Sequence, residues 1–68
     1  MIVHVNGAEH AVEEGATVAA IVELVGRERP RRGVAVAVGA EVVPRGEWDT
    51  RELREGERIE ILTAVQGG

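Results

Sequence analysis

The chain has 68 residues, of which 44% are apolar and 1% aromatic, and its net charge is −4 at pH 7. This length is enough for one small domain with an aliphatic core and excludes a second domain. The acidic balance argues against nucleic acid as a partner, because phosphate binding depends on clustered basic residues. We expect an electropositive protein surface as partner instead.

The first strand and its turn are indicated by alternation. Val3 and Val5 alternate with polar residues, which is typical of a strand with one buried face. Asn6 and Gly7 follow, and both residue types tolerate the positive φ of a two-residue hairpin turn. A second strand is therefore predicted to run back over residues 9–13.

A helix is predicted next, because the apolar period changes. Four apolar residues fall at i, i+3, i+4 and i+7 and form one stripe: Val18, Ile21, Val22 and Val25. Thr17 is the expected N-cap, and Gly26 is expected just after the last turn. Since so short a helix is unstable alone in water, its stripe must pack on a sheet.

The second half of the chain consists of strands joined by turns. Residues 34–38 are apolar on both faces, which indicates a central strand. Residues 41–43 return as a short strand that Pro44 ends. Trp48 follows in a polar loop, where we expect it to anchor the loop over the core through its indole N–H. The last strand is predicted over residues 58–62.

The last strand has two faces with different tasks. Ile59 and Ile61 are expected to point inward, so Leu62, with the opposite parity, is expected to point outward. Leu62 and Val65 would then form an exposed apolar pair, which is typical of a protein interface. The alternative is that Leu62 packs under the edge of the helix or against Trp48.

This order of elements predicts an α+β fold: a mixed sheet of four to five strands with one main helix packed on one face. A helical crossover joins parallel neighbours, so the last strand can lie centrally beside the first. No segment approaches the roughly 18 apolar residues of a membrane span, and Met1 leads directly into a strand pattern. We therefore expect a cytoplasmic protein with no membrane partner.

The residues offer no conventional catalytic or metal-binding constellation. His4 and His10 lie on separate predicted strands without a third ligand at metal spacing. Serine and cysteine are absent from the sequence, which removes the usual nucleophiles and any thiol that holds sulfur on a side chain. Lysine is absent as well, so the chain has no internal acceptor for an isopeptide bond. We expect a protein that is not an enzyme by itself and binds no cofactor of its own.

The sequence finishes with Gly67 and Gly68, a few residues after the predicted last strand. Glycine has no Cβ, so such a tail can enter a narrow channel and bring its carboxylate close to a nucleotide phosphate. Extended, residues 63–68 reach about 20 Å. The alternative is an unstructured end without a role.

Several segments together resemble one family. The stretch Val-Val-Pro-Arg-Gly-Glu-Trp at 42–48, Glu-Gly-Glu-Arg-Ile-Glu-Ile-Leu at 55–62, the short length and the final Gly-Gly are similar to the bacterial thiamine-pathway sulfur carriers, the ThiS family, with a ubiquitin-like β-grasp fold. The resemblance covers essentially the whole chain. It implies a β-grasp domain over residues 1–64 and an extended tail over 65–68.

The resemblance also implies a chemical role for the last residue. In such carriers an E1-like adenylyltransferase uses ATP and magnesium to adenylate the terminal glycine, here Gly68. Sulfur from a donor protein then replaces the AMP, and the thiocarboxylate supplies sulfur to thiazole synthase. Gly67, which has no side chain, would keep the tail next to Gly68 narrow. The position before the glycines is a departure, because many relatives have a small apolar residue where this tail has Gln66.

Two other functions remain open at this point. The small subunit of molybdopterin synthase, or a carrier of another sulfur-transfer pathway, shares the fold and the Gly-Gly end. A β-grasp interaction module that is never activated would carry its glycines incidentally. Removal of Gly68 separates a carrier from a passive module, because only a carrier loses adenylation.

Overall fold

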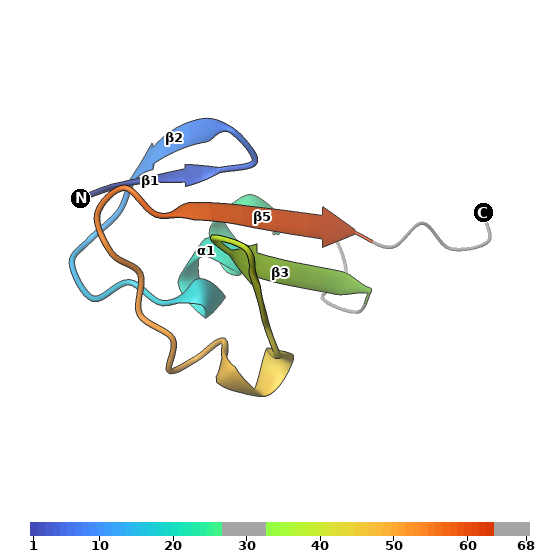
Figure 1. The fold of residues 1–68 in the computed structure, drawn as a ribbon. Helices are drawn as coiled ribbons and strands as arrows, with labels where there is room; N and C mark the ends of the chain where they lie inside the picture. Colours follow the sequence, from blue (N-terminus) through green and yellow to red (C-terminus); the bar gives the residue numbers. More distant parts are fainter. Residues whose placement is uncertain (27–32, 64–68) are drawn as a thin grey trace.

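The structure is a computed structural model that describes residues 1–26 and 33–63. Five strands, one α-helix and one short 3₁₀ helix follow each other along this part of the chain (Figure 1). In chain order they are β1 (Ile2–Val5), β2 (Ala8–Ala11), α1 (Val18–Gly26), β3 (Val34–Val38), β4 (Glu41–Val43), η1 (Arg45–Glu47) and β5 (Arg58–Thr63).

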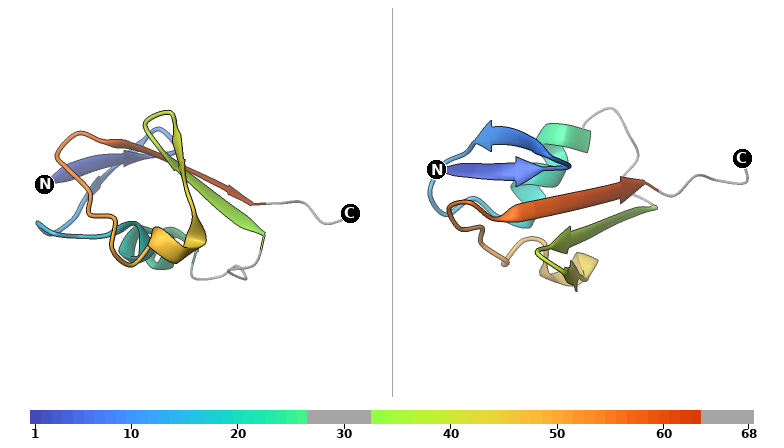
Figure 2. Two further views of the ribbon diagram at one scale, coloured as in Figure 1. Left: turned by 60° about the horizontal axis from the view of Figure 1, so that its bottom comes forward. Right: turned by 45° about the horizontal axis from the view of Figure 1, so that its top comes forward.

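The strands form one mixed sheet in the order β2-β1-β5-β3-β4. The last strand is central: β5 runs parallel to β1 and antiparallel to β3, and β2 and β4 form the two edges. Helix α1 crosses one face of the sheet (Figure 2). No helix or strand of residues 1–26 and 33–63 covers the other face, which we call the open face. The predicted α+β plan, with its central last strand and single main helix, is confirmed.

The first hairpin turns where the sequence predicts. Asn6 has φ 51° and Gly7 has φ 87°, the left-handed conformations that a two-residue turn requires. Strand β2 covers Ala8–Ala11 rather than the predicted 9–13. It begins earlier because the turn is only two residues long, and it ends earlier because its partner β1 begins at Ile2.

The core lies between α1 and the covered face of the sheet. Its buried side chains are aliphatic except for one indole: Val3, Val5, Val18, Ile21, Val22, Val36, Val38, Val43, Trp48, Leu53 and Ile59. Three of the four residues of the predicted helical stripe belong to it. The fourth, Val25, is 40% exposed in the last turn, so the burial of α1 covers its first turns only.

The helix begins at the predicted cap. The hydroxyl oxygen of Thr17 accepts a hydrogen bond from the backbone N–H of Ala20 at 3.4 Å, as an N-cap residue does. At the other end Gly26 is the last residue of α1, whereas the sequence predicts it just after the end of the helix.

The remaining N–H groups of the first helical turn are bonded by the segment before β5. Val18 donates to the carbonyl of Arg51 at 2.9 Å, and Ala19 donates to the carbonyl of Trp48 at 3.0 Å. The side chain of Leu53 from the same segment is 4% exposed in the core. Sequence reasoning missed Leu53, because a single leucine between charged residues has no periodicity.

The predicted loop after β4 contains one turn of 3₁₀ helix, η1, followed by Trp48. The indole Nε1–H of Trp48 donates to the carbonyl of Val43 at 2.9 Å inside the core. The guanidinium of Arg45 lies over the indole ring, 5.2 Å from its centroid. Trp48 is therefore the loop anchor that the sequence predicts.

Candidate functional site

The outward side chains of β5 lead toward the tail. Arg58, Glu60 and Leu62 alternate with Ile59, which is 1% exposed, and Ile61, which is half-buried against the core. Leu62 is 63% exposed, as its parity predicts. The alternative in which Leu62 packs under the helix or against Trp48 is wrong, because Leu62 lies on the open face of the sheet.

Neighbouring strands extend this apolar surface. Leu62 pairs with Ala35 of β3, and Ala37, two residues further along β3, pairs with Val42 of β4. Val42 is 72% exposed. We call these four residues the outer apolar patch. Sequence reasoning named only Leu62, although the parity of Val42 against buried Val43 is a signal that points the same way.

The parallel ladder between β1 and β5 holds the strand that leads to the tail. The N–H of His4 donates to the carbonyl of Glu57, and the N–H of Asn6 donates to the carbonyl of Ile59, both at 2.9 Å. Strand β1 ends at Val5, so the backbone ladder has no further rung.

The side chain of Asn6 supplies that further rung. Its Oδ1 accepts a hydrogen bond from the N–H of Ile61 at 2.9 Å, and its Nδ2 donates to the carbonyl of the same residue at 3.2 Å. The side-chain amide thus pairs with β5 as a backbone peptide would. Sequence reasoning gave Asn6 only the turn, because nothing local reveals a partner 55 positions away.

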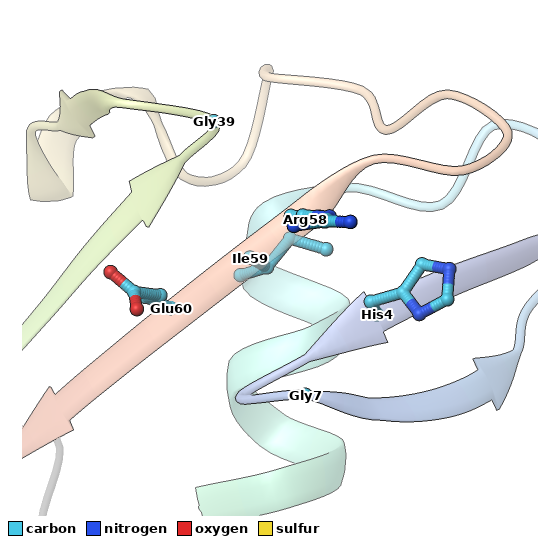
Figure 3. A pocket seen from close by; sticks show the side chains of 6 residues that line it. All are labelled: His4, Gly7, Gly39, Arg58, Ile59 and Glu60. Atoms are coloured by element: carbon cyan, nitrogen blue, oxygen red, sulfur yellow. The ribbon is translucent and has the colours of Figure 1, made fainter.

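A hollow of about 530 Å³ lies on the open face beside this ladder. His4 of β1 and Arg58 of β5 are register partners, so their side chains emerge on the same face (Figure 3). The lining residues are His4, Gly7, Gly39, Arg58, Ile59 and Glu60. We call this hollow the His4–Arg58 basin.

An ion pair braces the turn that leads into β5. Nη2 of Arg51 donates to Oε2 of Glu57 at 2.9 Å, and the backbone N–H of Arg54 donates to Oε1 at 2.8 Å. Partial burial raises the pKa of the Glu57 carboxyl, but these two hydrogen bonds and the positive charges of both arginines outweigh burial, so the pKa lies below its ordinary value.

Within residues 1–26 and 33–63, no three His, Asp or Glu side chains lie together as a metal site. His4 and His10 sit half-buried on adjacent strands, and their register places them on opposite faces of the sheet. In the same part of the chain no helix has the length and apolar character needed to cross a bilayer. The predicted tail residues Val65, Gln66, Gly67 and Gly68 lie outside the described residues.

The five-stranded mixed sheet, its central last strand and its single helix define a ubiquitin-like β-grasp protein. The model of the ThiS family matches residues 2–68, and the chain belongs to this family. A crystal structure of a thiamine biosynthesis protein (ThiS) from Geobacter metallireducens superimposes with a TM-score of 0.82 at 26% identity, over 100% of both chains. No curated protein matches the chain. The family predicted from the sequence is confirmed.

Proposed function

We propose that this protein is a sulfur carrier of thiamine biosynthesis, a cosubstrate rather than a catalyst. The carboxylate of Gly68 attacks the α-phosphate of ATP in an E1-like adenylyltransferase, and pyrophosphate leaves. A sulfide equivalent from a sulfur donor protein then attacks the acyl carbon and displaces AMP. The resulting thiocarboxylate supplies its sulfur to thiazole synthase. ATP and magnesium belong to the activating enzyme.

The observation that carries the proposal is the family match, which extends through Gly67 and Gly68. The name of the Geobacter metallireducens protein, a thiamine biosynthesis protein, supports the pathway. The composition is consistent with both. Since no cysteine is present, a C-terminal thioacid is the place where this chain can hold transferable sulfur, and without lysine self-conjugation does not compete.

The fold suits the delivery of a tail. β5 is central and held on both sides, by β1 with Asn6 and by β3, and its last residue is Thr63. The five residues that follow reach at most roughly 17 Å from that point. The globular body can therefore remain outside the active site of a partner while Gly68 reacts within it.

The partner enzyme is proposed to dock on the open face. The outer apolar patch lies beside the end of β5, and a small apolar surface next to a reactive terminus is typical of a protein interface. Leu62 forms the side of the patch on β5, and Val65 would continue it along the tail. When the partner is docked in this way, it also keeps water away from Gly68 while the sulfur is transferred.

Intact-mass analysis tests the proposal. The chain is incubated with a candidate E1-like enzyme, ATP, magnesium and a sulfide source, and replacement of one oxygen by sulfur is expected. The control is the same chain without Gly68, which should stay unmodified. Transfer of the sulfur to product by thiazole synthase then tests the pathway. A full-length chain that is never adenylated contradicts the carrier function, and a charged chain that thiazole synthase ignores contradicts the pathway.

A further inference from the structure

The His4–Arg58 basin has side-chain nitrogen donors that the carrier chemistry does not use. The parallel register places the imidazole of His4 and the guanidinium of Arg58 on adjacent strands and on the open face. Figure 3 shows both side chains beside the hollow, with the guanidinium on the side of β5 that faces β1. His4 is half-buried and Arg58 is exposed, so both can meet a group that arrives from solvent.

Two carboxylates lie on this face near Arg58, and neither forms an ion pair with it. Glu60 is two residues along the same strand, but its carboxylate lies on the β3 side of β5 and diverges from the guanidinium (Figure 3). Glu9 of β2 is the register partner of His4. Among the residues that the structure describes, the ion pair is between Arg51 and Glu57, and Arg58 takes part in none.

Arg58, like Arg54, makes no ion pair within the part of the chain that the structure describes. Acidic residues number 12 against 8 basic ones, so a surface arginine has many carboxylates available in the same molecule. Arg58 instead faces a hollow of about 530 Å³, next to a second nitrogen donor. A guanidinium presents two parallel N–H groups, a geometry that matches a carboxylate.

The basin is continuous with the outer apolar patch. Arg58, Glu60 and Leu62 are successive outward residues of β5, so each lies about 7 Å from the next. A partner that covers Leu62 therefore also reaches Arg58 if its contact extends over about 13 Å of strand. Glu60, which lines the basin, and Glu9, the register partner of His4, repel a carboxylate that approaches out of register.

We propose that the His4–Arg58 basin receives a carboxylate side chain, Asp or Glu, of the enzyme that docks on the open face. The inference rests on the proposed function and adds a charged contact to its apolar one. Docking of the acid fixes the register of the carrier on the partner surface. The contact is made before the reaction of Gly68 and does not touch the reacting atoms, so it acts on binding.

The test measures adenylation kinetics as the carrier concentration is varied. Arg58→Ala is expected to raise the KM for the carrier about tenfold, since charge pairs desolvated at interfaces couple strongly. The kcat at saturating carrier should stay unchanged. The KM of the variant should also rise less steeply with ionic strength than that of the wild type, because a screened attraction has been removed. His4→Ala should shift KM in the same direction by a smaller factor.

The matched control is Arg54→Ala, which removes the same charge from an exposed residue that precedes β5 and does not line the basin. It should leave KM and its salt dependence as in the wild type. Circular dichroism checks that each variant is folded. If Arg58→Ala behaves like Arg54→Ala while the wild type is adenylated, the carboxylate site is wrong and the carrier function stands. If the wild type itself is not adenylated, the carrier function is wrong and this inference with it.

Discussion

Asn6 and Ile61 are 55 positions apart in the sequence, yet the side-chain amide of the first makes two hydrogen bonds to the backbone of the second. One residue thus has two tasks, because Asn6 also adopts the positive φ of the first hairpin turn. The turn between β1 and β2 is thereby tied to the strand that leads to the tail. The point from which the tail departs is set by the first hairpin as well as by β3.

Asn6→Gly separates these two tasks. Glycine keeps the positive φ of the turn but loses both hydrogen bonds to Ile61. We expect a loss of about 1–2 kcal/mol in the free energy of unfolding and faster hydrogen exchange at the amide of Ile61. Asn6→Asp is the matched variant, since its carboxylate still accepts from that amide. Unchanged exchange at Ile61 in Asn6→Gly would show that the side chain does not hold β5.

Trp48→Phe tests the anchor of the loop. The ring remains apolar, but the carbonyl of Val43 loses the indole N–H that bonds it inside the core. We expect a destabilisation of about 1–3 kcal/mol by urea unfolding followed by circular dichroism, as for an unpaired buried acceptor. Equal stability of Trp48→Phe and wild type argues against this hydrogen bond.

Leu62→Glu tests docking on the open face. Leu62 is 63% exposed, so the fold should tolerate the charge, whereas a partner that covers the residue would have to bury it. We expect unchanged unfolding and a KM for adenylation raised at least about tenfold. Leu24→Glu is the matched control, because Leu24 is 54% exposed on the helix, on the other side of the sheet. Similar effects of the two substitutions would place the docking surface elsewhere.

Glu57→Gln tests the brace before β5. The folded-state pKa of Glu57 is lowered, so the carboxylate contributes stability above the unfolded-state pKa of about 4.3 and loses it as pH falls through the folded-state value. The stability advantage of the wild type over Glu57→Gln should therefore shrink as the pH falls below the unfolded-state pKa and through the lower folded-state pKa. At pH 7 the difference should be about 1 kcal/mol or less, since both side chains are partly exposed. Thermal unfolding at several pH values measures it, and a constant difference across this range would refute the brace.

Local patterns were sufficient for much of the architecture. Alternation around Val3 and Val5 predicted the first strand. The same alternation along the last strand predicted that Leu62 points away from the core. Thr17 could be identified as the N-cap of the helix because an N-cap side chain bonds to a residue only three positions further along the chain. The family followed from short segments with the Gly-Gly end.

The sequence by itself determined where elements lie and which side of each strand is buried, because side-chain direction has a fixed period along a helix or strand. Only the tertiary structure decided which strands meet and in what register, and with that the pairing of His4 with Arg58 and of Asn6 with Ile61. The burial of Leu53 was also decided by the tertiary structure, because the segment that carries it runs past α1 and thereby places its side chain in the core. Contacts of this kind depend on chain closure over tens of residues, which no local periodicity encodes.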